Sequence, residues 1–219
     1  TNDWVDLTGV ETIVFSDYTI SNPSPSNNPP TAINLSATSA NENIASGSTV
    51  ATLSTSDQDA GDTHTYTLVS GSGYSAGSID NNAFIIDGNQ LKIKESPDFE
   101  SKSSYSIRVQ TKDSGGLTLE KEVTFNVSDV NEEPAAVSLS ASVFDENIAG
   151  GSAVATLSTS DPDSEDIHSY ALVSGDGDAD NNAFRVDGDK LKIVESPDFE
   201  AKSSYSVRVQ TKDSGGLTF

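Results

Sequence analysis

The chain has 219 residues, with 34 acidic against 12 basic side chains and a formal net charge of -22. A surface this acidic repels polyanions, so nucleic-acid binding and docking on anionic lipid are disfavoured and cations are the natural partners. No apolar run approaches the ~20 residues that span a bilayer, which argues against membrane insertion, and the lack of Cys excludes disulfides as a source of stability.

The first piece of the chain, residues 1–20, contains the strand-like stretch VETIVFSDYTI. We interpret it as the end of a preceding β segment or as a donor strand. The longer stretch DLTGVETIVFSDYTI resembles segments that follow glycine-rich RTX repeats in secreted bacterial proteins. Residues 21–29, SNPSPSNNP, have no hydrophobic pattern and are expected to form a semi-extended linker.

The rest of the chain repeats itself. ANENIASGSTVATLSTSDQDAGDTH, from Ala40, aligns with FDENIAGGSAVATLSTSDPDSEDIH, from Phe144. The register holds as far as Gly71 and Gly175, where the first copy carries extra residues, as expected of an insertion in a surface loop. One unit is therefore about 100 residues long, a common domain size, and we place the first repeat at residues 30–133 and the second at residues 134–219.

Short strand-like runs broken by Gly, Asn, Asp and Pro fill the first repeat. They lie at residues 32–37, 49–55, 63–69, 83–86, 91–94, 104–111 and 120–128. About seven such strands per ~100 residues predict an all-β fold of two tandem immunoglobulin-like Greek-key sandwiches. Because Phe219 is the equivalent of Leu119, the second sandwich is expected to lack its last strand, either because the chain is a truncated piece or because another chain supplies that strand.

Pairs of carboxylates recur at fixed places in the pattern. In an extended segment residues i and i+2 point the same way, so Asp57 and Asp59, and likewise Asp98 and Glu100, should each present two carboxylates to one spot. Such pairs are unfavourable unless a cation lies between them. Ca²⁺ binds six to eight oxygens in irregular loop geometry, so the pattern predicts calcium sites.

The acidic residues are expected at both ends of each sandwich. In the first repeat one group lies in loops before the second and sixth strands, and it comprises Glu42, Asp98 and Glu100. The other group lies where those strands end, and it comprises Asp57, Asp59 and Asp113. The sequence therefore predicts one acidic cluster at each end of a unit.

These motifs together resemble the cadherin repeat. The shared features are NEN with Glu42 and DEN with Glu146, a D-x-D after the second strand, a D-x-E, an Asp after the sixth strand, and the linker DVNEEP from Asp129 to Pro134. The serine- and threonine-rich style TSDxDxxDxHxY is similar to bacterial cadherin-like repeats of large secreted adhesins. The resemblance implies a calcium-binding protein at the cell surface or outside the cell.

Carried over residue by residue, the resemblance implies a calcium junction between the repeats. Its ligands would be Glu42, Asp98, Glu100, Asp129, Asn131, Glu132, Glu133, Asp161, Asp163 and Asp213. The first linker, SNNPP, has no carboxylate, so Asp57, Asp59 and Asp113 are expected to form a smaller site. Asp62 and Asp166 are candidates for the place of an Asn ligand. In the second repeat the further candidates are Glu146, Asp198 and Glu200.

The function predicted is that of calcium-rigidified, non-enzymatic adhesion or spacer repeats, whose partners are neighbouring repeats, further copies of the chain or a glycan. Alternatives are a filament in which Val10 to Ile20 fills the incomplete second repeat of another copy, an accessory module of an extracellular enzyme, a carbohydrate-binding module, or acids that are only a solvated surface. His64 and His168 lack the partners that catalysis or zinc binding requires, so we expect a structural role for both.

Overall fold

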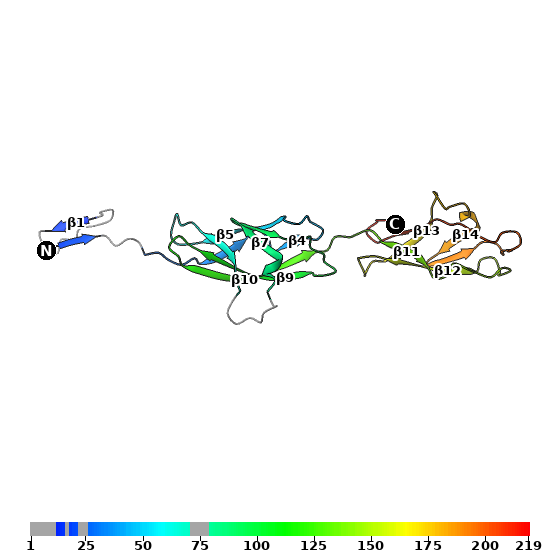
Figure 1. The fold of residues 1–219 in the computed structure, drawn as a ribbon, viewed down its shortest axis with the longest axis horizontal. Coiled ribbons are helices and arrows are strands. Elements are labelled where there is room, and N and C mark those ends of the chain that lie inside the picture. The colour runs from blue at the N-terminus through cyan, green and yellow to red at the C-terminus, as the bar shows by residue number, and fades with distance from the viewer. Residues whose placement is uncertain (1–11, 16–17, 22–25, 71–78) are drawn as a thin grey trace, which may run out of the picture. The chain divides into compact units, whose positions relative to one another are not determined.

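The structure, a computed structural model, describes residues 12–15, 18–21, 26–70 and 79–219. It divides into two compact units, Thr1–Ser128 and Asp129–Phe219 (Figure 1). Residues 129–133 are grouped with the second unit, whereas the sequence placed the boundary at 133/134. Strands and two short 3-10 turns are the only regular elements of the described residues, so the predicted all-β class is confirmed.

Near the N-terminus, β1 (Thr12–Phe15) and β2 (Tyr18–Ser21) pair with each other in antiparallel fashion, with Thr12 opposite Ser21. The described part of the segment from Val10 to Ile20 is thus a hairpin, where we had expected one continuous strand. Val10, and Trp4 at the start of the chain, lie outside the described residues.

The first unit is a sandwich of two four-stranded sheets. One sheet has the order β3-β5-β8-β7, with β3 at Ala32–Leu35, β5 at Thr49–Ser56, β8 at Gln90–Ile93 and β7 at Phe84–Asp87. The other has the order β4-β10-β9-β6, with β4 at Ser39–Asn41, β10 at Thr118–Ser128, β9 at Ser104–Lys112 and β6 at Thr65–Leu68. All seven predicted runs are strands. Sequence reasoning missed only the short β4, which pairs parallel to β10, and the 3-10 turn η1 (Asn81–Ala83).

The core of the first unit lies between the two sheets and depends on β10. Its alternate residues Val123, Phe125 and Val127 are buried, at 5, 1 and 5% exposure, while their neighbours face solvent. The Phe125 ring packs edge-on against Phe84, with ring centroids 5.6 Å apart. Every second residue of this part of β10 therefore faces the core, as the two-residue period of a strand requires.

The second unit repeats the first sheet but carries only part of the other. One sheet has the order β11-β12-β15-β14, with β11 at Ala136–Leu139, β12 at Ala153–Ser160, β15 at Lys190–Ile193 and β14 at Phe184–Asp187. The other consists of β13 (Ser169–Leu172) and β16 (Val209–Lys212), and η2 spans Asn181–Ala183. Among the described residues, the counterpart of β10 is reduced to a bridge between Lys212 and Thr218.

The described residues include no helix long and apolar enough to cross a membrane.

Candidate cation-binding sites

A cluster of three carboxylates lies at one end of the first unit, where β5 and β9 finish. Oxygens of Asp57, Asp62 and Asp113 all lie within 4.8 Å of one another. Asp113 is 5% exposed and the Asp57 side chain 4%. Like charges this close and this shielded from water repel strongly, so the arrangement favours a cation among them.

The same cluster recurs in the second unit. Asp161, Asp166 and Asp213 again bring three carboxylate oxygens within 4.8 Å, with Asp213 at 5% exposure and the Asp161 side chain at 3%. The counterparts take the same partners as well: Ser114 Oγ donates to Asp62 Oδ1 and Ser214 Oγ donates to Asp166 Oδ1. We name these two clusters the upper clusters.

Local turn chemistry explains why the last Asp of each upper cluster is held so firmly. The carboxylate of Asp113 accepts the Leu117 N–H at 2.8 Å, while the Asp113 N–H donates to the Leu117 carbonyl at 3.0 Å. Gly116 has φ +96°, a conformation that glycine adopts without strain. The repeated DSGGLT thus forms a hairpin turn, and that turn points the Asp into the cluster.

Each upper cluster keeps one carboxylate oxygen without a hydrogen-bond partner. Asp62 Oδ2 and Asp166 Oδ2 are both buried and have no partner among the described residues. A buried, unpaired carboxylate oxygen costs free energy unless a cation or water satisfies it. These oxygens therefore fit a hard cation with oxygen ligands.

The histidines bind to the upper clusters rather than forming a site of their own. His64 Nε2 lies 2.9 Å from Asp57 Oδ2, and His168 Nε2 lies 2.7 Å from Asp161 Oδ2. The bond from His64, followed by one from the Asp59 N–H, holds the pKa of Asp57 below its ordinary value. Asp57 thus stays ionised, and the two His orient one ligand each, in keeping with the structural role predicted for them.

Hydrogen bonds to Asp213 have a similar effect on that group. Burial raises the pKa of Asp213, but a side-chain hydrogen bond from Asn131 and backbone N–H bonds from Leu217 and Gly216 outweigh it, and the pKa lies below the ordinary value. The carboxylate is therefore ionised at neutral pH, the state that a calcium ligand requires.

Residues that precede each unit's first strand reach its upper cluster, which sequence reasoning did not foresee for the first unit. Asn27 Nδ2 donates to Asp113 at 3.1 Å, and the Asn28 N–H donates to Asp59. In the second unit Asn131 Nδ2 donates to Asp213 at 3.0 Å and the Glu132 N–H to Asp163 at 2.7 Å. Alignment of SNNPP with VNEEP would have matched these residues pairwise.

A glycine makes room for each of these Asn side chains. A Cβ at Gly115 would lie 2.3 Å from the Asn27 side chain, and a Cβ at Gly215 would lie 2.1 Å from Asn131 Oδ1. The first glycine of the DSGG turn is therefore required by the close approach of the Asn, and not by its backbone conformation.

The structure corrects the expected pairing within D-x-D. Asp57 joins Asp62 and Asp113, whereas the Asp59 carboxylate accepts the N–H and the side-chain amide of Asn28. In the second unit, likewise, Asp161 joins Asp166 and Asp213, whereas Asp163 accepts the Glu132 N–H. The residues lie beyond the strand end, where the Asp59 N–H folds back to Asp57 Oδ1, so the period-two rule for strands no longer applies.

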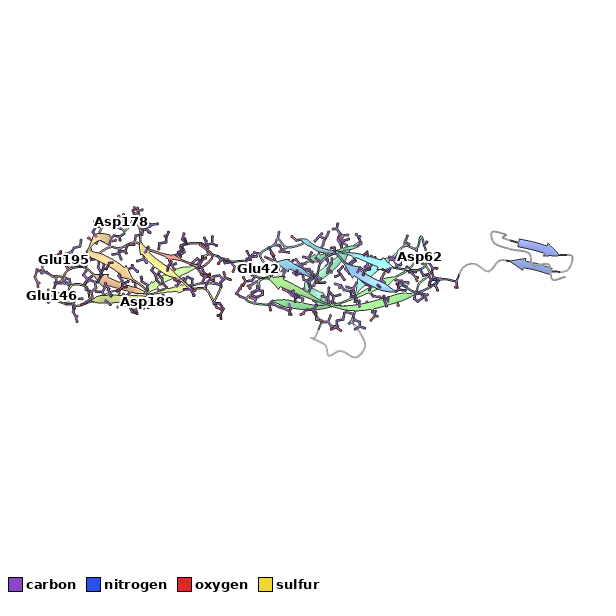
Figure 2. The ribbon with its side chains drawn as sticks, turned by 180° about the vertical axis from the view of Figure 1, so that it is seen from behind. Glu42, Asp62, Glu146, Asp178, Asp189 and Glu195 are labelled. Atoms are coloured by element: carbon purple, nitrogen blue, oxygen red, sulfur yellow. The ribbon has the colours of Figure 1, made fainter. Side chains whose placement is uncertain are left out.

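At the opposite end of the first unit, Glu42 is 2% exposed and its carboxylate accepts the Phe99 N–H at 2.8 Å. Oxygens of Glu42 and Glu100 lie within 4.8 Å of each other. Asp98 instead accepts the backbone N–H and the hydroxyl of Ser101, which lower its pKa. In this unit the two carboxylates of the D-x-E motif therefore have different partners. Figure 2 shows Glu42 and Asp62 at opposite ends of the unit, as the sequence predicted.

The second unit has the corresponding group, but it is open to solvent. Glu146, Asp198 and Glu200 place oxygens within 4.8 Å of one another, and all three are exposed. We name the groups around Glu42 and Glu146 the lower clusters. The remaining predicted ligands lie in the segment between β10 and β11, where Asp129 and Glu133 are exposed and Glu132 is half-buried.

Comparison with known proteins identifies the fold. No protein-family model matches the chain. Human Protocadherin Fat 4 is 34% identical over 122 residues, which cover 53% of this chain and 2% of that protein, and rat Cadherin-8 is 32% identical over 125 residues, or 52% and 16%. Human Protocadherin-24 EC1-2 superposes with a TM-score of 0.61 at 21% identity, covering 86% of this chain and 89% of that one. Both units have the cadherin-like fold.

Mouse Cadherin-23 EC22-24 is a further structural relative, with a TM-score of 0.59 and 20% identity over 83% of this chain and 59% of that one. The similarity thus extends over both units, whereas the sequence matches cover small parts of far longer relatives. The predicted tandem cadherin-like sandwiches are confirmed.

Proposed function

We propose that the chain is a pair of calcium-binding, non-enzymatic repeats of an extracellular protein, which serve as an adhesive or spacer segment. The observation that carries this proposal is the upper cluster, present twice in the same register with three carboxylates within 4.8 Å and one buried unpaired oxygen in each copy. The sequence relatives are cadherins, which supports an extracellular adhesive setting.

Calcium fits the donor set better than other common metals. All the clustered ligand atoms are carboxylate oxygens, with no thiolate, and a hard cation that accepts many oxygens in irregular geometry is the usual partner of such a set. Asp57, Asp62 and Asp113 would hold one ion in the first unit, and their three counterparts would hold one in the second. The chemistry supplied is charge neutralisation, which stabilises the loops without any reaction.

The lower clusters and the segment that follows β10 complete the proposed ligand set. The cadherin-like resemblance implies further ligands among Glu42 and Glu100 of the first unit and Asp129, Glu132 and Glu133 of the segment that follows it in sequence. Bound calcium would remove their mutual repulsion and stiffen the segment. This part of the proposal rests on the cadherin-like resemblance and on the order of these residues along the chain.

Several finer predictions stay predictions: the bacterial surface setting, adhesion between copies and a glycan ligand. The filament alternative needs a donor strand, and the self-paired hairpin of β1 and β2 does not favour it over the spacer role.

Thermal unfolding in chelator and then across a calcium titration tests the proposal. For a dissociation constant of ~0.1 mM and ~10 mM calcium, one site adds about 2.7 kcal/mol to the free energy of unfolding. That corresponds to a rise in Tm of roughly 10 °C or more for a unit of this size. Asp113→Asn should blunt the rise of the first unit and Asp213→Asn that of the second.

Two controls make the result specific. Glu95→Gln removes an exposed carboxylate outside the clusters and should leave the calcium response unchanged, and magnesium at equal concentration should produce a smaller rise because it demands a stricter geometry. A Tm that does not move with calcium, or moves equally in all variants, would contradict the proposal and leave the acids as a solvated surface.

A further inference from the structure

Two hydrogen bonds join three hydroxyl side chains inside the first unit, next to its upper cluster. Thr55 Oγ1 donates to the Tyr66 hydroxyl at 2.9 Å and lies 2.9 Å from Thr111 Oγ1. Thr111 is fully buried, and the other two residues are half-buried. We name this group the hydroxyl triad.

The second unit has the same triad at the equivalent positions. Thr159 Oγ1 donates to the Tyr170 hydroxyl at 3.0 Å and lies 2.7 Å from Thr211 Oγ1, and Thr211 is again fully buried. Burial of a hydroxyl costs free energy that its hydrogen bonds only repay, whereas an apolar side chain has no such cost. The presence of a buried polar network in both units therefore indicates a role beyond filling the core.

The triad lies one strand step from the upper cluster. Thr55 precedes Asp57 by two residues at the end of β5, and Thr111 precedes Asp113 by two residues at the end of β9. The residue between the members of each pair is exposed, whereas the two Asp side chains are shielded from solvent. The inward face of each strand therefore continues from a hydroxyl to a carboxylate.

The third member, Tyr66, is equally close to the cluster along the chain. It follows His64 by two residues, and His64 binds the Asp57 carboxylate. Asp62 lies in the loop between β5 and β6, and the bond between Thr55 and Tyr66 joins the two strands that flank this loop. All three carboxylates of the cluster therefore belong to chain segments that the triad holds together.

The triad also links the two sheets of the sandwich. β5 belongs to one sheet and β6 and β9 belong to the other, so both bonds of Thr55 run between sheets. One strand step further from the cluster, Leu53 of β5 and Val109 of β9 are buried in the apolar core. Apolar packing is not directional, whereas a hydrogen bond requires a narrow range of distances and angles. The triad therefore fixes the separation of the sheets near the point where their carboxylates meet.

We propose that the residues of the hydroxyl triad are positioning residues for the upper cluster. By fixing the ends of β5, β6 and β9, they hold Asp57, Asp62 and Asp113 at the spacing that suits calcium, and they act through these carboxylates without contacting the ion. The inference rests on the proposed calcium-binding function and names residues that set the affinity of that site. A framework of fixed size should also disfavour the smaller Mg²⁺, because the choice between the two ions depends on cavity size and flexibility.

Two substitutions of one buried residue separate positioning from stability. Thr111→Val keeps the shape of the side chain but removes its hydroxyl, whereas Thr111→Ser keeps the hydroxyl and removes a methyl group. Both should lower the urea midpoint of the first unit in chelator, since the first loses a buried hydrogen bond and the second leaves a small cavity. Only Thr111→Val should weaken calcium binding, by about three- to tenfold, because it acts less directly than the contacts to a metal ligand whose loss costs roughly 10–100-fold.

Calcium affinity is measured by titration calorimetry on the 219-residue chain carrying Asp213→Asn, so that the upper cluster of the second unit does not contribute. The upper site of the first unit is then the one that the further change Asp113→Asn removes. In the same background Tyr66→Phe, which removes the acceptor of the Thr55 hydroxyl, should weaken calcium binding as Thr111→Val does.

Two controls make the result specific. Val127→Ala destabilises the first unit from a buried position beside Ala40, on β4, and should change its calcium affinity less than about twofold. Repeating the titrations with magnesium should show a smaller loss in Thr111→Val than calcium does, so that the preference for calcium falls.

The possible failures are distinguishable. If the parent chain shows no calcium binding that Asp113→Asn removes, the proposed function is wrong and this inference fails with it. If the parent binds calcium but Thr111→Val and Thr111→Ser have equal affinity, or Tyr66→Phe binds as the parent does, the proposed function stands and the positioning role of the triad is overturned.

Discussion

The loop SPDFE occurs in both units, yet the lower clusters beside it differ. Glu42 is 2% exposed, whereas Glu146 is exposed, although each accepts the backbone N–H of the Phe in the SPDFE loop of its own unit, Phe99 and Phe199 respectively. In the first unit β10 contributes contacts here: its last residue, Ser128, accepts the Glu42 N–H at 3.0 Å, and its Val127 packs inward. Residues outside the SPDFE motif therefore contribute to the burial of Glu42.

The upper clusters behave in the opposite way. Asp113 and Asp213 have the same 5% exposure, and each binds the Asn side chain of the preceding segment. Their geometry comes from the local turn and from a single loop contact, so it is the same with or without a full sandwich. The upper clusters are thus set by nearby residues and the lower clusters by distant ones.

The largest effect is expected from removing the aromatic anchor of β10. Phe125→Ala should lower the free energy of unfolding of the first unit by about 3–5 kcal/mol, because it empties a buried ring site against Phe84. Urea unfolding followed by circular dichroism measures this. Phe199→Ala removes the same side chain from an exposed position and should cost less than about 1 kcal/mol. Equal losses would refute the assignment of Phe125 to the buried core.

A second test compares the lower clusters directly. Glu42→Ala in calcium-free buffer should destabilise the first unit by about 2 kcal/mol, since the Phe99 N–H loses its acceptor in a buried place. Glu146→Ala should change the free energy of unfolding of the second unit by less than about 0.5 kcal/mol, because Glu146 is exposed to solvent. An equal cost in both units would contradict the comparison.

A smaller effect should follow from Gly215→Ala. The new Cβ would displace Asn131 from Asp213 and remove one hydrogen bond, at a cost of about 0.5–1.5 kcal/mol. Gly115→Ala should lower the free energy of unfolding of the first unit by the same amount, because Asn27 and Asp113 form the equivalent hydrogen bond there. Combining Gly215→Ala with Asn131→Ala should add nothing to the loss from Asn131→Ala alone. Additive losses would mean that the glycine acts through something other than Asn131.

The smallest difference between the units is expected in how their stability responds to acid, because each unit has its own copy of the same ion pair, Lys102–Asp80 in the first and Lys202–Asp180 in the second. Burial raises the pKa of Asp80, but hydrogen bonds from Lys102 and the Ser106 N–H outweigh it, and the equivalent bonds from Lys202 and Ser206 lower the pKa of Asp180. Because both pKa values lie below those of the unfolded chain, folding favours the ionised form. The stabilisation should be complete above about pH 4 and be lost as the pH falls through the lowered values.

Urea midpoints in chelator between pH 6 and pH 3 measure this acid response. Lys102→Met and Lys202→Met should flatten the acid limb of their own unit by similar amounts. A midpoint that rises as the pH falls would contradict the sign of the argument.

Much of this could be predicted from the sequence because it depends on short-range patterns. The strand-like runs at residues 104–111 and 120–128 predicted β9 and β10, and the repeat matched Asp113 with Asp213. The separation of Asp57 from Asp59 could not be predicted by a strand rule, because both residues lie in a turn after β5.

Contacts between residues far apart in the sequence could not be predicted from sequence patterns either. The approach of Asn27 to Gly115 joins residues far apart in sequence, and nothing in SNNPP by itself indicates an acceptor.

A direct count of bound calcium tests the central claim, that the upper clusters are cation sites. Equilibrium dialysis of the 219-residue chain against a calcium series should show saturable binding of two or more ions per chain, with one ion lost in Asp113→Asn, one lost in Asp213→Asn and none lost in Glu95→Gln. Absence of saturable binding at millimolar calcium, or a count unchanged by both Asp substitutions, would contradict the account.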